Sequence, residues 1–139
     1  MKILKYLLYF LIGGASYYTL EFSYRTLLHR GDTHWTMFII GGFSLMAILL
    51  IDDLLRIPIV FKAILGGIAI TVMEFILGGF YLYILHDPIW TYGTAAFMKV
   101  ISFTWSLLWC ALALLVLLIR RLPHYWRKKR NQKKEPTDE

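Results

Sequence analysis

The chain has 139 residues, is 58% hydrophobic and 17% aromatic, and carries a formal net charge of +6. A mean hydropathy of +0.58 excludes a soluble fold of this length, because a soluble domain must cover its surface with polar groups. The charged residues gather at the ends and in short gaps between apolar runs. The composition therefore indicates a single integral membrane domain.

Four long apolar runs follow one another along the chain, at residues 3–28, 35–51, 59–85 and 95–119. Each is long enough for a helix to cross a bilayer. The first run begins like a signal peptide, but aromatic and apolar residues continue beyond its small residues, which favours a retained span. We therefore expect an all-α integral membrane protein with four transmembrane helices within residues 1–121.

The positive charge is concentrated near the carboxyl terminus, where eight of the fifteen basic residues lie between positions 120 and 134. Because this block directly follows an apolar run, we expect a basic cytoplasmic tail at 122–139, partly disordered, that contacts anionic lipid and not nucleic acid. Four spans return the amino terminus to the same side, although Arg25 and Arg30 then fall outside. The sequence predicts a multi-pass protein of the cell membrane with both termini in the cytoplasm.

Two segments of the chain resemble each other. A diglycine at 13–14 is followed after six residues by Glu21, and a diglycine at 66–67 is followed after six residues by Glu74. Two spans in each unit would give both units the same orientation, so the match predicts two tandem hairpins related as a parallel repeat. Matches of this kind also arise by chance in apolar sequence of low complexity, and that alternative stays open.

Glu74 is the strongest candidate for a functional residue. It lies inside the third run, about 24 Å of helix rise from Pro58. A carboxylate at such a depth costs a few kcal/mol unless it is neutral, paired or hydrated. Glu74 is therefore either a protonatable or cation-binding group, or a structural carboxyl bonded to a neighbouring helix. Glu21 precedes Arg25 by four residues, a spacing that permits an ion pair within one helix.

The polar gaps on the outer side contain histidines and carboxylates, which are typical ligands of divalent metals. Their spacing matches no ligand pattern, and we expect them to be solvated loop residues. We predict no cofactor, no metal site and no catalytic residue, because no nucleophile has a base nearby. The candidate binding residues are Glu74, Glu21, Arg25, His34 and Trp35.

Several motifs point to a known family, and the most specific is His-Trp-Thr-Met at 34–37 followed by the diglycine at 41–42. The others are Gly13-Gly14 with Tyr17 and Glu21, Glu74-Phe75 with Gly78, Trp90 with Tyr92, Trp109, and Tyr125-Trp126. Together they resemble the small bacterial membrane proteins known as type IV ABC transporter permeases. The chain departs from the family at 98–100, where members carry Gly-Gln, and at 120–121, where they often carry acidic residues.

The resemblance implies a permease that works with a separate ATPase, since the chain has no ATP-binding motif of its own. Four spans enclose little space, so passage of a small solute or ion would require a homo-oligomer or a partner membrane subunit. We expect Glu74 and Glu21 to line the site. The alternative is a non-transporting assembly or regulatory subunit, in which the two glutamates only fix the register of the helices.

Overall fold

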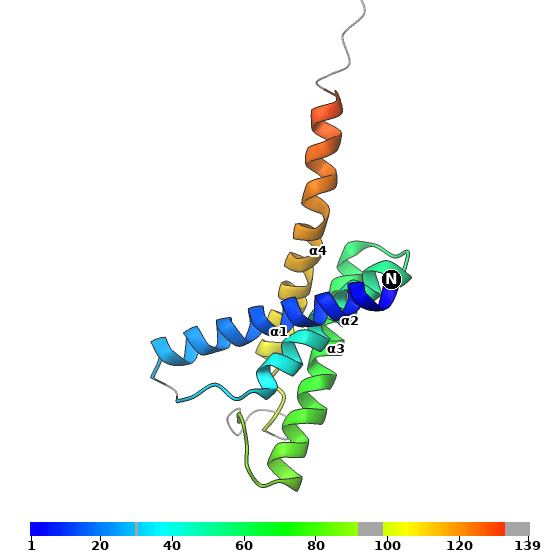
Figure 1. The fold of residues 1–139 in the computed structure, drawn as a ribbon. Coiled ribbons are helices and arrows are strands. Elements are labelled where there is room, and N and C mark those ends of the chain that lie inside the picture. Colours follow the sequence, from blue (N-terminus) through cyan, green and yellow to red (C-terminus); the bar gives the residue numbers. More distant parts are fainter. Residues whose placement is uncertain (30, 92–98, 133–139) are drawn as a thin grey trace, which may run out of the picture.

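The computed structural model describes residues 1–29, 31–91 and 99–132. Its elements are α1 (Lys2–Leu27), α2 (Thr36–Leu54), α3 (Ile59–Gly79), the π-helical turn η1 (Phe80–Ile84) and α4 (Phe103–Gln132). The expected all-α architecture is confirmed for this part of the chain. α1 packs against α2 and α3 against α4, while α2 also contacts both α3 and α4. In Figure 1, α1 runs at a steep angle to α3 and α4.

Among the described residues, three segments are long and apolar enough to cross a membrane, namely α2, the continuous stretch Ile59–Ile84, and α4. They correspond to the second, third and fourth expected spans and are consistent with a membrane protein. α1 has 26 residues but is not among them, because Lys5, Glu21 and several tyrosines lower its hydropathy. The structure therefore supports three spans, and the fourth stays a prediction.

The start of α4 lies later than expected. The apolar run predicted a span at 95–119, but the helix begins at Phe103 and residues 99–102 precede it. Lys99 has a positive φ of 61°, a left-handed conformation that interrupts a right-handed helix. The chain therefore turns at Lys99 before α4 begins, and residues 95–98 lie outside the described residues.

The other end of α4 extends further than expected. The helix passes through Pro123 and ends at Gln132, so residues 122–132 of the expected tail are helical, while 133–139 lie outside the described residues. Proline inside a helix usually costs about 3 kcal/mol, because it cannot donate a backbone hydrogen bond and clashes with the preceding turn. This end extends away from the other helices (Figure 1), and each residue from 121 to 132 is exposed.

Glycines bring the helices of each hairpin into close contact. A β-carbon added at Gly13 of α1 would lie 2.5 Å from the carbonyl oxygen of Gly41 on α2. One added at Gly67 of α3 would lie 2.8 Å from the backbone nitrogen of Cys110 on α4. Both diglycines of the sequence match therefore lie at the interface within their own hairpin, where small residues allow close approach of the backbones. The repeat itself stays a prediction.

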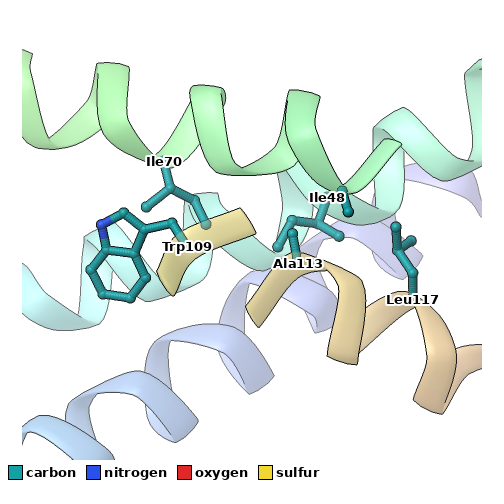
Figure 2. Packing of buried hydrophobic residues seen from close by; sticks show 6 residues of the cluster. Ile48, Ile70, Trp109, Ala113 and Leu117 are labelled. Atoms are coloured by element: carbon teal, nitrogen blue, oxygen red, sulfur yellow. The ribbon is translucent and has the colours of Figure 1, made fainter. Parts of the chain in front are cut away.

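The buried core lies where α2, α3 and α4 meet (Figure 2). Its cluster of buried side chains consists of Ile48, Ala63, Ile70, Trp109, Ala113 and Leu117. Tyr17 of α1 packs against this cluster and completes its edge. Trp109 lies at the end of the core that borders the cavity described next.

Candidate functional site

A cavity of about 700 Å³ lies at one end of the core and is lined by residues of all four helices and of the segment after η1. Three of the five predicted site residues, Glu21, Arg25 and Glu74, contribute to its lining. The sequence analysis expected both glutamates to line one site, and the structure brings both to the same cavity. The cavity is therefore the place where the chemistry predicted from the sequence converges.

Glu21 and Arg25 form the ion pair that their spacing on α1 permits. The Nε atom of Arg25 donates to Oε1 of Glu21 at 2.7 Å, and the two side chains are 16% and 20% exposed, respectively. The guanidinium group also donates to the carbonyl oxygens of Asp32 at 3.1 Å and Ile89 at 3.5 Å. Arg25 thus connects α1 to the segments before α2 and after η1, and its donors are engaged on three sides.

Glu74 comes from α3 and is only 4% exposed. The apolar sequence around it forms a helix because Pro58 caps its start and no further proline interrupts it before η1. The helix therefore carries a carboxyl group into the interior, where charge is expensive unless the surroundings compensate it. The Glu74 side chain contributes to the lining of the cavity.

His34 and Trp35 do not line this cavity. Nδ1 of His34 accepts a hydrogen bond from the backbone N–H of Thr36 at 3.3 Å and lies 2.8 Å from the Thr36 hydroxyl oxygen. Its ring also meets Tyr81 edge to face, with 5.5 Å between ring centroids. His34 therefore satisfies a donor in the first turn of α2, and the exposed Trp35 lies beside it.

Aromatic residues make up much of the cavity wall, and the sequence analysis did not assign them to a site. They are Tyr17 and Tyr24 of α1, Trp90 of the segment after η1, and Trp105 and Trp109 of α4. A signal was present, because Tyr17, Glu21, Tyr24 and Arg25 follow the i, i+4, i+7, i+8 spacing of one helix face. Trp105 and Trp109 are four apart in the same way.

A second charged cluster lies at the opposite end of the core, around Asp52 and Asp53 at the end of α2. Asp52 accepts from Nζ of Lys62 at 2.6 Å and from Arg120 at 2.9 Å. The Lys62 and Asp52 side chains are only 8% and 12% exposed. Asp52 thus joins α2 to α3 and α4 through ion pairs that are largely shielded from water.

Asp53 extends the cluster to the first helix. It accepts from Lys5 of α1 at 2.6 Å and from Arg120 of α4 at 2.6 Å, and the Tyr6 hydroxyl donates to it at 3.1 Å. The cluster thus includes residues of all four helices. The sequence analysis did not predict this cluster. A signal was present, because two carboxylates follow one apolar run and basic residues lie near the ends of the other three runs.

Comparison with protein-family models gives no match, and neither the curated proteins nor the solved structures give one. The likeness to type IV ABC transporter permeases stays a prediction from motifs. The site is therefore interpreted from its own residues.

Proposed function

We propose that this protein spans the membrane with four helices and binds a small charged solute in the cavity between them. The observation that carries the proposal is that Glu21 and Glu74, which belong to different hairpins, line one cavity of about 700 Å³. Cavities of this size suit small molecules. Ionisable groups inside a membrane domain are expensive, and they commonly mark solute or ion sites.

The ion pairs around Asp52 and Asp53 support the four-span arrangement. Lys5 near the start of α1 and Lys62 near the start of α3 both bind carboxylates at the end of α2. Arg120 of α4 binds the same carboxylates. Spans whose ends meet at one membrane face would be joined in this way, and the basic end of α4 supports the proposal that this face is cytoplasmic. The cavity then belongs to the outer half of the bundle.

Passage of the solute through the membrane requires more than these four helices. We propose that the chain acts as a homo-oligomer or with a partner membrane subunit, and that a separate ATPase would supply energy for active transport. Lipid surrounds the bundle, and anionic headgroups meet the exposed basic end of α4.

The second candidate is a non-transporting assembly or regulatory subunit. It is favoured by the helical basic segment 121–132, which is exposed along its whole length and presents a surface to lipid or a cytosolic protein. In that case Glu21 and Glu74 stabilise the register of the helices and no solute enters.

The test compares Glu74→Gln, which removes the charge and keeps the shape, with Asp87→Asn, a change at an exposed carboxylate outside the cavity. Purified protein is titrated with a panel of small cations, anions and zwitterions, and tryptophan fluorescence reports binding because three tryptophans line the cavity. We expect the wild-type protein and Asp87→Asn to respond to the same solutes and Glu74→Gln to lose the response. Loss of assembly in Glu74→Gln, with no solute response in the wild type, would favour the second candidate.

A further inference from the structure

Several aromatic rings in the cavity wall lie close to one another. The rings of Tyr17 and Trp109 lie 5.9 Å apart between centroids, and those of Trp109 and Trp105 also lie 5.9 Å apart. Tyr24 and Trp90 add further rings to the lining. Faces of Trp and Tyr carry negative charge density and attract cations that hold water weakly, such as alkylated or protonated amines.

The charged groups of the lining favour a positive solute. They are two carboxylates, Glu21 and Glu74, and one guanidinium group, Arg25. The guanidinium group is bound to Glu21 and to two backbone carbonyl oxygens, so an anion would have to displace these bonds to reach it. Among the described residues, the lining therefore has one more acidic group than basic groups, and the guanidinium group of Arg25 is already bound.

A bare metal ion does not suit this lining. Metal ions are held by several closely placed oxygen, nitrogen or sulfur ligands. Within residues 1–29, 31–91 and 99–132, no three His, Cys, Asp or Glu side chains are placed to hold one. The volume of about 700 Å³ instead suits a molecule with an apolar body.

We propose that the cavity binds a monovalent organic ammonium ion, with its positive group between the carboxylates and the aromatic rings. The inference rests on the proposed function and names the class of its solute. The carboxylate of Glu74 attracts the positive group of the solute, and a neutral analogue lacks this attraction. Trp105 is partly exposed at the cavity wall and supplies an aromatic ring for a cation–π contact. The apolar side chains of Met37 and Ile40 complete the lining around the body of the solute.

The experiment uses three probes of nearly the same shape, namely choline, its neutral isostere 3,3-dimethylbutanol and the anion 3,3-dimethylbutanoate. Binding to the full-length protein in detergent is measured as the rise in unfolding temperature with probe concentration, because a ligand stabilises the state that it binds. Far-UV circular dichroism follows unfolding and shows directly whether each variant is folded. The variants are Glu74→Gln, Trp105→Leu and Trp105→Phe.

We expect choline to bind the wild-type protein at least tenfold more tightly than either analogue. Glu74→Gln should remove most of this preference, Trp105→Leu should weaken choline binding by about fivefold to thirtyfold, and Trp105→Phe should restore part of it. Equal or tighter binding of the neutral or anionic probe would overturn the cation assignment and leave the proposed solute site intact. Absence of any stabilisation by choline would overturn the ammonium assignment, and the wider panel of solutes described above then decides whether the proposed site exists. Equal choline binding by Trp105→Leu and the wild type would refute the role of the ring.

Discussion

Replacing Asp52 by asparagine tests whether the charged cluster at the end of α2 stabilises the bundle. The change leaves the ammonium group of Lys62, whose side chain is 8% exposed, with a neutral amide and the Asp52 carbonyl oxygen at 3.1 Å. Removing one partner of a buried ion pair typically costs about 3–5 kcal/mol. Because Arg120 is 29% exposed and keeps some hydration, we expect a loss of about 2–4 kcal/mol in the free energy of unfolding.

The assay is equilibrium unfolding in mixed micelles with an increasing fraction of sodium dodecyl sulfate, followed by circular dichroism. Asp53→Asn is the matched control, because Asp53 is 24% exposed and its partners Lys5 and Arg120 are 42% and 29% exposed. An exposed pair contributes at most about 1 kcal/mol. Equal losses from Asp52→Asn and Asp53→Asn would refute the reasoning from burial.

A second variant separates the buried charge from other effects of the substitution. Adding Lys62→Met to Asp52→Asn removes the uncompensated ammonium group and keeps the apolar bulk of the side chain. The double variant should recover part of the lost stability, since replacing a buried ion pair by apolar residues is often neutral. A double variant less stable than Asp52→Asn would show that the stranded charge is not the cause.

Three further predictions concern helix contacts and the basic end of α4. Gly41→Ala should lower the free energy of unfolding by about 1–3 kcal/mol, because the added β-carbon would overlap α1. Gly79 has open space around it, so Gly79→Ala should raise the free energy of unfolding by about 0.5–1 kcal/mol through helix propensity. Both changes are measured with the same unfolding assay. The thiol of Cys110 lies against Gly67 and should react with a water-soluble maleimide far more slowly in the folded protein than in the denatured protein, by mass spectrometry. Replacing the basic residues at 127–130 by glutamine should reduce the amount of anionic lipid that co-purifies with the protein. Each Lys or Arg near an anionic membrane surface contributes about 1 kcal/mol to the attraction between protein and lipid. An unchanged amount of co-purified anionic lipid would contradict this prediction.

The helical architecture could be predicted from the sequence, because the length and apolar composition of each run are enough to indicate a helix. α2 and the continuous stretch Ile59–Ile84 follow the runs expected at 35–51 and 59–85 within a few residues, since the ends of these runs carry charges or a proline. α4 begins and ends later than the span expected at 95–119, because apolar composition does not reveal the left-handed turn at Lys99 or the helix that continues past Pro123. Backbone conformation at such points depends on contacts that a hydropathy pattern does not contain.

The candidate site could be predicted in part. Glu21, Arg25 and Glu74 were identified by the expense of charge in apolar surroundings, and all three line the cavity. His34 and Trp35 were grouped with them at the outer end of the second apolar run, but the structure places them just before α2 and outside the lining. The aromatic wall was missed because aromatic residues are frequent everywhere in this chain, and only helix packing decides which of them face a common space.

The continuity of α4 has a mechanical consequence. Trp105 in the cavity wall and Arg120 in the charged cluster belong to one helix and lie about 22 Å apart along its axis. A helix is stiff over that length, so a tilt imposed at Trp105 moves the guanidinium group that holds the two carboxylates at the end of α2. If the cavity binds the proposed solute, its occupancy would therefore act through α4 on the contacts that join all four helices at the other end of the bundle.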